Sequence, residues 1–583
     1  MKRRREAMEN KSRRDSAMTV AKAAALSALS TAGAANLTDR QPLALLALWC
    51  ACAMVAWWAV RRPAEKRLNR VALTLGAVFA VMLVIGREIH QEQTIEALLT
   101  WSASIKALFR IVGLTALCWA VLRIVLRWAV RMHATDRCGG PAFWKIWLAI
   151  LVCWMPYYVF FFPGCLSPDS ISELDMILGG APLSNHHPLI HQWTVAPFVL
   201  LGRALGSVAW GVGLYSLFQM MAMSAIFAAV VRRLMTEGAG RGLTAAVLVF
   251  YALVSVHAFY SVTMWKDVLF GGITVIAVMM LTRLVKCGEA PASEPFGRKN
   301  WVLLAVVLFL FCVYRNNGYY AFLLCFPVFL LCNRRLWKPL LALGAVVLLL
   351  VGAYQTLIFD VLGAKKSNAG EALALPLQQI AKTVREYNRE LSQDEMEALE
   401  EIFTSVEEVR WAYSPELSDP VKDLLNNDVL MSNPLRYLKV WAQIGMEHPL
   451  VYLDAFLYHT HGYWYPDVPY WAIERKIVSN AYGLQQRGSS VRQLLCDVYD
   501  AVERAPVLGA LCRPAPYVWA ALIAFAALVC KRRARLASPW VLLVGIWLTS
   551  MASPVFAEFR YMYGVVTCMP LCVGVALTAH RRA

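Results

Sequence analysis

The amino-acid sequence predicts an all-α, polytopic helical membrane protein with 13 or 14 spans. Only 16% of its 583 residues are charged, whereas soluble domains carry about 25%, and its mean hydropathy is +0.50. Apolar runs close to 20 residues long recur between short basic clusters, and about 20 apolar residues form a helix that crosses roughly 30 Å of hydrocarbon. The short alternating segments typical of a membrane β-barrel are absent from the sequence.

The chain begins with a basic segment, residues 1–40, of which Met1 to Asp15 are expected to be a disordered cytoplasmic tail. Its Ala-rich stretch 18–36 is only weakly apolar, so it is either a marginal first span or an amphipathic segment. Residues 41–140 follow as accessory spans. If the basic tail lies inside the cell, the stretch 18–36 must cross the membrane and the total is 14 spans; otherwise it is 13.

The rest of the chain divides into a membrane core (141–359), a polar segment (360–515) and C-terminal spans (516–583). Beyond the N-terminal stretch, the expected spans are 41–60, 71–86, 104–126, 143–162, 208–231, 242–261, 268–285, 301–314, 318–332, 339–358, 516–530, 539–553 and 562–579.

Positive charge predicts the orientation of these spans in the plasma membrane. The net charge of +18 is concentrated at the ends of apolar runs, and short basic loops stay cytoplasmic. The charge therefore reports topology, and nucleic acid is not an expected partner. The apolar stretch 188–205 would put Arg232 and Arg233 outside if it crossed the membrane. We expect it to lie in or on the outer leaflet instead, which leaves the loop 163–207 outside.

The polar segment 360–515 is expected to form a small extracytoplasmic helical domain. It holds 15 basic and 22 acidic residues in a chain that is otherwise positive. Leu391 to Val409 is acidic and helix-prone, and Tyr437 to Tyr458 is amphipathic and aromatic-rich, as in helices that lie on a bilayer. Cys496 and Cys512 both fall in polar sequence, and their spacing leaves a disulfide open.

The outer loop Pro163 to His191 holds the densest group of ionisable residues. Such groups beside an apolar wall suit acid/base chemistry, because partial desolvation tunes their pKa values; the alternative is a solvated acidic loop whose histidines cap helices. The candidates in this loop are Asp169, Glu173, Asp175, His186, His187 and His191.

Three further outer clusters carry basic residues next to spans. Lys266, beside Asp267, suits a lipid-phosphate oxygen as a point charge, although a snorkelling lysine paired with its neighbour is as plausible. Arg315, followed by Asn316, offers a planar fork that matches phosphate, or it belongs to a structural turn. The third cluster contains Glu558, Arg560 and Tyr561, which either contact a sugar or phosphate or form a structural ion pair.

An aromatic segment in the 360–515 domain is a candidate acceptor site. Aromatic rings stack on sugar faces and carboxylates bind hydroxyls, but Trp and Tyr also populate membrane interfaces without a catalytic role. The residues concerned are His461, Tyr463, Trp464 and Asp467. Together with His186 and His187, His459 and His461 permit a divalent metal, but the spacing does not indicate one, and no cofactor is expected with certainty.

The loop motifs SPDS (167–170), NHHP (185–188), WKD (265–267), RNNG (315–318), GYWYPD (462–467) and EFRY (558–561) carry a resemblance. Over about residues 140–580 the chain resembles the GT-C superfamily of membrane glycosyltransferases. The elements that carry this resemblance are Asp169 in an outer loop soon after a span, His187-Pro188, the apolar stretch 188–205 and the span that ends on Arg232 and Arg233. Within the superfamily, the chain is most similar to uncharacterised bacterial multi-pass proteins with these motifs. The first hundred residues lie outside the resemblance.

The resemblance implies an inverting transferase whose donor is a sugar on a polyprenyl phosphate and whose acceptor is a cell-envelope glycan or lipid. Asp169 best matches the first-loop carboxylate that removes the proton from the acceptor hydroxyl, with Glu173 and Asp175 as the next candidates. Lys266, Arg315 and Arg560 are then expected to bind the donor phosphate.

Two other functions stay open. An envelope-lipid transporter or flippase usually has its polar site at mid-membrane, in broken helices, whereas the ionisable residues here are expected at the outer face. Another lipid-linked transferase, such as a phosphotransferase or ligase, would share the outer site, and only its products would distinguish it.

Overall fold

The computed structural model describes residues 2–34, 42–61, 65–135, 139–288 and 296–581. Across these ranges the regular elements are helices, and β pairing is limited to isolated bridges. The predicted all-α class is therefore confirmed. The chain divides into two compact units, unit 1 (1–133, 519–534 and 579–583) and unit 2 (134–518 and 535–578).

Unit 1 is an assembly of long helices: α1 (Lys2–Ala34), α2 (Pro42–Arg61), α3 (Lys66–Glu92), α4 (Trp101–Arg131) and most of α23 (Ala515–Cys530). Helices α1 and α4 approach closely at Gly113, where a Cβ would lie 2.5 Å from the carbonyl oxygen of Leu29. The basic first residues, expected to lack regular structure, are helical from Lys2, so that expectation is wrong. They contain good helix formers and no Gly or Pro before Gly33.

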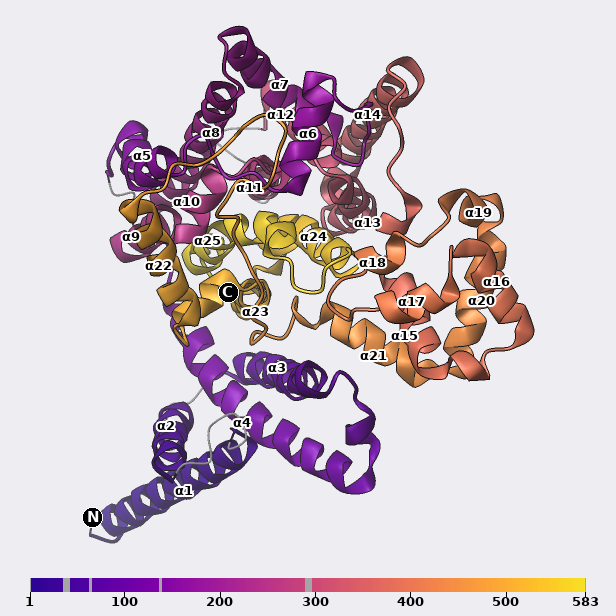
Figure 1. Ribbon diagram of the computed structural model, residues 1–583. Coiled ribbons are helices and arrows are strands. Elements are labelled where there is room, and N and C mark those ends of the chain that lie inside the picture. The colour runs from indigo at the N-terminus through magenta and orange to yellow at the C-terminus, as the bar shows by residue number, and fades with distance from the viewer. Residues whose placement is uncertain (1, 35–41, 62–64, 136–138, 289–295, 582–583) are drawn as a thin grey trace. The chain divides into compact units, whose positions relative to one another are not determined.

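Unit 2 contains the remaining apolar helices: α5 (Phe143–Phe160), α8 (Val208–Thr236), α9 (Arg241–Leu253), α10 (Ser255–Ser261), α11 (Lys266–Cys287), α12 (Arg298–Val313), α13 (Asn316–Cys332), α14 (Trp337–Thr356), α24 (Val541–Met551) and α25 (Tyr563–Thr578). The C-terminal helices, yellow in Figure 1, pack into this group: α25 lies against α11 and α24 against α13. Gly271 permits the first contact, because a Cβ there would lie 2.8 Å from the Tyr563 ring.

Among the described residues, eight helical segments are long and apolar enough to cross a membrane, by length and composition, and each coincides with an expected span. They are 66–92, 101–131, 143–160, 208–236, 266–287, 334–361, 534–551 and 559–578. Helices α9 and α10 are bent by 50° and count as a ninth span if they cross together, and three shorter apolar helices lie within 47–61, 316–332 and 515–530. These findings indicate a multi-pass membrane protein.

Helices α6 (Pro168–Leu178) and α7 (Leu189–Ala204) form the first loop of unit 2. Helix α7 is 16 residues long, and its location in or on the outer leaflet stays a prediction. Its close packing on α8 depends on Gly202, where a Cβ would lie 2.3 Å from the backbone nitrogen of Gly211. This packing fixes the helix that carries His191.

The segment 360–515 is helical, as expected, and has its own apolar core. Its helices are α15 (Ala374–Tyr387), α16 (Gln393–Ile402), α17 (Val406–Ala412), α18 (Asp419–Lys422), α19 (Asn427–Ser432), α20 (Pro434–Glu447), α21 (Pro449–His461) and α22 (Ser490–Arg504). Leu377, Ala381, Leu399, Val409 and Ile444 are buried in that core. Cys496 and Cys512 are buried free thiols, so the disulfide that the spacing left open is not formed in the structure.

An extended strap between α21 and α22 returns to the first loop of unit 2. The Leu166 backbone N–H donates to the carbonyl oxygen of Lys476 at 3.1 Å, and the Val478 N–H donates to that of Leu166 at 3.0 Å. The Gln486 amide donates to the carbonyl oxygen of Gly164 at 2.8 Å. These contacts hold the chain immediately before α6.

Candidate functional site

The first turn of α6 carries Asp169. Ser167 precedes the helix, Pro168 occupies its first position, and the Ser170 hydroxyl accepts a hydrogen bond from the Ser167 backbone N–H at 3.2 Å. Proline favours the first position of a helix, and an acidic side chain in the first turn interacts favourably with the helix dipole. The SPDS motif therefore forms the start of α6 and fixes the position from which the Asp169 side chain projects.

Two hydrogen bonds attach this helix start to the segment before α11. The Ser170 hydroxyl donates to the carbonyl oxygen of Met264 at 2.8 Å, and the Trp265 indole N–H donates to the Ser167 hydroxyl at 2.8 Å. Both bonds are buried, and a buried polar group that loses its partner costs about 1–3 kcal/mol. The SPDS and WKD motifs are therefore held together as one structure, although they are far apart in sequence.

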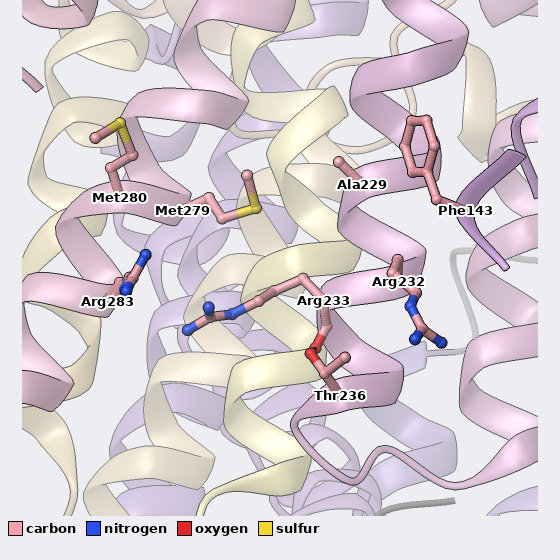
Figure 2. A pocket seen from close by; sticks show the side chains of 8 residues that line it. All are labelled: Phe143, Ala229, Arg232, Arg233, Thr236, Met279, Met280 and Arg283. Carbon is pink, nitrogen blue, oxygen red and sulfur yellow. Dashed lines mark hydrogen bonds between the residues drawn. The ribbon is translucent and has the colours of Figure 1, made fainter. Parts of the chain in front are cut away.

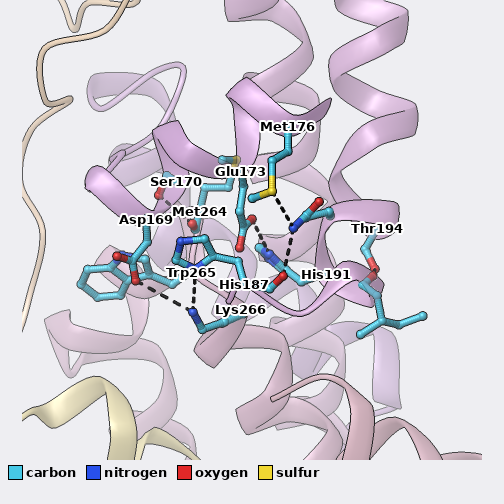
Figure 3. A network of polar contacts seen from close by, with 12 residues as sticks. Asp169, Ser170, Glu173, Met176, His187, His191, Thr194, Met264, Trp265 and Lys266 are labelled. Atoms are coloured by element: carbon cyan, nitrogen blue, oxygen red, sulfur yellow. Dashed lines mark hydrogen bonds and ion pairs between the residues drawn. The ribbon is translucent and has the colours of Figure 1, made fainter. Parts of the chain in front are cut away.

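Three basic or imidazole side chains surround the Asp169 carboxylate. The Arg560 guanidinium donates from Nη1 to Asp169 Oδ2 at 2.7 Å, and Lys266 Nζ lies 4.0 Å from the same oxygen. Lys266 Nζ also lies 3.0 Å from Nδ1 of His187. Figure 3 shows Lys266 in contact with both Asp169 and His187. The Asp169 side chain remains 34% exposed, so a substrate group can reach the carboxylate.

The charges in this group determine its protonation. Burial would raise the pKa of Asp169, but the positive charges of Arg560 and Lys266 outweigh that and hold the pKa well below its ordinary range. Burial, reinforced by Lys266, lowers the pKa of His187 to about 2, so His187 is neutral at pH 7. A lysine ammonium can only donate hydrogen bonds, so Nδ1 of His187 accepts the bond from Lys266. The ring proton of the neutral His187 therefore lies on Nε2.

Arg560 lies between two aromatic rings. Its guanidinium carbon is 5.3 Å from the centre of the Trp265 ring and 5.4 Å from that of Tyr561. Aromatic faces attract a guanidinium, and more strongly where water is excluded. The rings orient the guanidinium fork toward Asp169 without occupying all its N–H donors.

Arg315 forms a second, more enclosed pair. Its Nη1 lies 2.8 Å from Asp267 Oδ1 and donates to the carbonyl oxygen of Tyr561 at 3.2 Å. Its guanidinium carbon also lies 4.4 Å from the centre of the Tyr561 ring. The Arg315 side chain is only 7% exposed and that of Asp267 1%. The sequence predicts phosphate binding by Arg315, but the structure encloses this side chain in a buried ion pair.

Glu558 is a third carboxyl group in the same cluster. It is 1% exposed, and its Oε1 lies 3.5 Å from Arg560 Nε. Within the described residues, this oxygen accepts no hydrogen bond. Burial raises the pKa of Glu558 to about 7, against the opposing charge of Arg560. The cluster as a whole matches three cations (Lys266, Arg315 and Arg560) with three carboxyls (Asp169, Asp267 and Glu558).

Glu173 lies one turn after Asp169 but belongs to a different network. Its Oε2 lies 2.7 Å from Nδ1 of His191 on α7, and His191 Nε2 lies 2.9 Å from the Tyr215 hydroxyl on α8. That hydroxyl donates to Gln219 at 2.9 Å. All four side chains are buried. They join α6 to α7 and α8, and the structure does not bring Glu173 to the basic cluster.

The other candidates near the first loop lie at its edges. His186 is exposed and lies 3.8 Å from Glu371, which Lys422 also contacts. Asp175 accepts a hydrogen bond from the Tyr482 hydroxyl of the extended strap. The Asn316 amide donates to the carbonyl oxygen of Asn185 at 3.3 Å, so the RNNG and NHHP motifs are in contact.

The GYWYPD segment reaches the cluster through Tyr463. The buried Tyr463 hydroxyl donates to the Val555 carbonyl oxygen at 2.7 Å and lies 3.3 Å from the Glu558 backbone nitrogen. The Trp464 indole instead donates to Thr460, and the exposed Asp467 accepts from Arg513. Tyr463 therefore supports the loop that carries Glu558 and Arg560.

Two predicted histidines lie beside the same loop. His461 is buried and its ring lies 5.3 Å from that of Phe556, while His459 Nε2 lies 2.8 Å from the Ser553 carbonyl oxygen. Within the described ranges, no group of three or more His, Cys, Asp or Glu side chains has the arrangement of a metal site.

Sequence analysis did not single out Trp265, Tyr215 or Gln219 as site residues. Trp265 contacts both Ser167 and Arg560. Tyr215 and Gln219 are polar residues four positions apart in an apolar span, so they share one helix face. That spacing is a signal that a buried hydrogen-bond network crosses α8.

Comparison with known proteins gives one match. A family model described as "Family of unknown function (DUF6020)" matches residues 178–583, which include Lys266, Arg315 and Arg560 but not Asp169. No curated protein and no solved structure matches the chain.

Proposed function

We propose that this chain, which belongs to the DUF6020 family of unknown function, is a GT-C-type glycosyltransferase of the plasma membrane. It would move a sugar from a polyprenyl phosphate to a glycan or lipid acceptor at the outer face of the membrane. The observation that carries the proposal is the contact of one accessible carboxylate, Asp169, with two cations, Arg560 and Lys266. A base and a phosphate-binding group are the two parts that such a transfer requires.

The proposed step inverts the configuration at the anomeric carbon of the sugar. The acceptor hydroxyl oxygen attacks that carbon, and the bond from the carbon to the phosphate oxygen breaks. Asp169 takes the hydroxyl proton. The polyprenyl phosphate leaves with the bonding electrons and therefore carries one more negative charge than it had in the donor. Arg560 and Lys266 would stabilise that charge, Arg560 through two N–H groups in one plane and Lys266 as a point charge.

The two cations keep Asp169 a poor base. Its pKa is held low by Arg560 and Lys266, and general-base catalysis is most effective when the pKa lies near the working pH. A donor phosphate that draws these two cations away would raise the pKa of Asp169. Donor binding would then prepare the base, and the acceptor would be activated only when the donor is in place.

Arg315 has a supporting role in this proposal. Its charge is neutralised by Asp267 and its side chain is almost fully enclosed. It holds the Tyr561 carbonyl and therefore the residue next to Arg560. Donor-phosphate contact by Arg315 stays a prediction that would require its pair with Asp267 to open.

The transporter alternative receives less support from the charge distribution. In α8 and α11 the charged residues lie in the first or last two turns, and α25 has none. Transport sites usually lie near mid-membrane. The phosphotransferase alternative uses the same groups and differs only in whether the phosphate moves with the sugar.

The experiment is to follow a polyprenyl phosphate labelled in both its sugar and its phosphate in membranes with and without the protein. Transfer of sugar alone supports the proposal, and Asp169→Asn should abolish it. Transfer of sugar with phosphate indicates a phosphotransferase, and a donor that changes leaflet intact indicates a flippase. A donor that stays intact on its original side contradicts all three.

The location of the site has a separate test. In a chain without native cysteines, we expect a cysteine placed at exposed Pro182, in the first loop, to react with an impermeant maleimide in intact cells. A cysteine at exposed Arg241, before α9, should stay protected. The reverse labelling pattern would contradict an outer site.

A further inference from the structure

The extended strap between α21 and α22, residues 462–489, carries an exposed tryptophan, Trp471. It is 44% exposed, whereas the other aromatic residues of the strap, all of which the structure describes, are buried or half-buried. Trp471 lies four residues beyond Asp467, the last residue of the GYWYPD motif. Single exposed apolar side chains are common on protein surfaces, so the surroundings of Trp471 decide what it can do.

Contacts with the membrane helices place Trp471 beside the candidate site. The Tyr260 hydroxyl donates to the carbonyl oxygen of Ala472 at 2.9 Å, which fixes the residue after Trp471. The centre of the Trp471 ring lies 6.1 Å from that of Trp265, and the Trp265 ring also packs on the Arg560 guanidinium. Trp265 is therefore the one side chain between Trp471 and Arg560.

Tyr470 connects the same part of the strap to the loop that carries Glu558. Its ring lies 5.3 Å from that of Phe556 and 6.1 Å from that of Trp471, measured between ring centres. Burial, reinforced by the charge of Glu558, raises the pKa of Tyr470, so its hydroxyl keeps its proton at neutral pH. The two strap residues therefore offer an aromatic surface with a hydroxyl at the border of the cluster.

This combination of groups suits a sugar ring. The C–H groups on one face of a pyranose contact the face of an aromatic ring, which carries negative charge density, while the sugar hydroxyls need hydrogen-bond partners. The Asp169 carboxylate is 34% exposed and can accept from them. The Lys266 ammonium has three N–H donors, and within the described residues it makes one hydrogen bond, to His187. A tryptophan that serves the membrane interface needs no such cluster beside it.

A cavity near the C-terminal end of α11 lacks this combination. It has a volume of about 340 Å³, and Figure 2 shows its lining residues, Phe143, Ala229, Arg232, Arg233, Thr236, Met279, Met280 and Arg283. None of these described residues is a carboxylate, and Arg233 is paired with Glu237 at 2.6 Å. Basic side chains at helix ends are explained by membrane topology, so these arginines require no ligand.

We propose that Trp471 stacks against a sugar ring of the acceptor, with Tyr470 beside it and Asp169 at the reacting hydroxyl. The inference rests on the proposed function, because it names the group that binds the acceptor at the same site. In that mechanism the donor phosphate contacts Arg560 and Lys266, which leaves the strap for the acceptor. Trp471 contacts no reacting atom, so it acts on acceptor binding and leaves the chemical step unchanged.

The first measurement is saturation-transfer difference NMR on the purified full-length protein in phospholipid nanodiscs, which contain no sugar. The probes are the methyl glycosides of glucose, galactose, mannose and N-acetylglucosamine. We expect the wild type to transfer saturation to the C–H groups on one face of at least one glycoside. Trp471→Ala should lower that transfer about fivefold or more, because one aromatic face is lost. The matched control is Trp411→Ala, which removes a 75% exposed tryptophan from α17 and should behave as wild type.

Two further variants protect the test from a folding defect. Trp471→Phe keeps an aromatic ring and should retain most of the transfer. Trp471→Leu keeps apolar volume without a ring, so it should lose the transfer as Trp471→Ala does. Full transfer in Trp471→Ala or in Trp471→Leu would make Trp471 a membrane-interface residue and would overturn the proposal, as would a wild type that transfers saturation to none of the glycosides.

The source of the sugar ring and the proposed function are tested separately. Purified Trp471→Ala should retain the labelled donor as well as the wild type does, and a loss would assign the ring to the donor sugar and overturn the acceptor assignment. Saturation transfer needs no turnover, so glycoside binding through Trp471 without transfer of the label contradicts the glycosyltransferase proposal and leaves the sugar contact. Transfer of the label with an acceptor KM unchanged in Trp471→Ala contradicts this inference alone.

Discussion

Asp169 and Glu173 are two carboxylates on the same short helix, one turn apart, with different surroundings. Asp169 is 34% exposed and meets two cations, Arg560 and Lys266. Glu173 is 2% exposed and pairs with His191, from which hydrogen bonds continue into α8. An incoming anion can replace a partly exposed carboxylate as the partner of its two cations, whereas it cannot reach an enclosed ion pair. The two carboxylates therefore differ in their partners and in their accessibility, although they lie in the same loop.

The largest expected effect is on turnover in Asp169→Asn. Losing a general base typically lowers the rate by 10²- to 10⁴-fold, and we expect a loss in that range in the labelled-donor assay. Donor binding should stay near the wild-type level or tighten, because Arg560 and Lys266 are released from their counter-charge. The melting temperature should fall as well, because a pKa held this low means that the ionised carboxylate stabilises the fold, so turnover is compared per folded molecule.

Glu173→Gln is the matched control for that variant. It makes the same chemical change four residues along the same helix, so it should leave most of the turnover of the folded protein. If Glu173→Gln removes turnover while Asp169→Asn retains it, the roles of the two carboxylates are reversed.

The second prediction concerns stability. Glu173→Ala leaves His191 buried without its carboxylate, and breaking a buried pair costs about 3–5 kcal/mol. We therefore expect a large drop in unfolding free energy in denaturant titrations of the detergent-solubilised protein. The double variant Glu173→Ala/His191→Phe should lose less than the two single variants added together, because the pair is already broken in each. Additive losses would mean that Glu173 and His191 act independently.

Sequence patterns identified the loop, the motifs and all eight long spans, because apolar length and residue type are local properties. Through the resemblance they also predicted one site for Asp169, Lys266 and Arg560, but not which of these side chains contact one another. Arg560 and Asp169 are separated by almost the whole of unit 2, and nothing local indicates that they meet. The sequence does not predict the burial of Arg315 either, because Asp267 and Tyr561, which enclose it, belong to other elements. The first residues are helical because they combine their charge with good helix formers, so charge alone does not predict a lack of structure.

The third prediction tests the contact that holds Asp169 in its low-pKa state. Arg560→Gln removes the larger of the two positive influences on that carboxylate, so the pKa of Asp169 should rise. The acid limb of the pH profile of kcat/KM should therefore move to higher pH. Donor binding should weaken about ten- to a hundredfold, as expected for the loss of a charge-assisted hydrogen bond.

Arg513→Gln is a matched control, because Arg513 pairs with the exposed Asp467 outside the cluster. It should leave both the pH profile and donor binding unchanged. An unchanged acid limb in Arg560→Gln would mean that another group limits the rate at low pH.

The smallest expected effect concerns the pH dependence of stability and depends on Glu558. Burial raises its pKa from 4.5 to about 7, so between these pH values the folded protein keeps a proton that the unfolded chain has lost. The resulting stability is present below about pH 4.5 and is lost as the pH rises through 7. Glu558→Gln has no proton to lose, so the melting temperature of the wild type relative to this variant should fall between pH 5 and pH 8. Glu447→Gln, which changes an exposed carboxyl at the end of α20, should show a nearly constant difference over the same range. A constant difference for Glu558→Gln as well would mean that Glu558 is ionised throughout, and that Arg560 faces two charged carboxylates before any phosphate arrives.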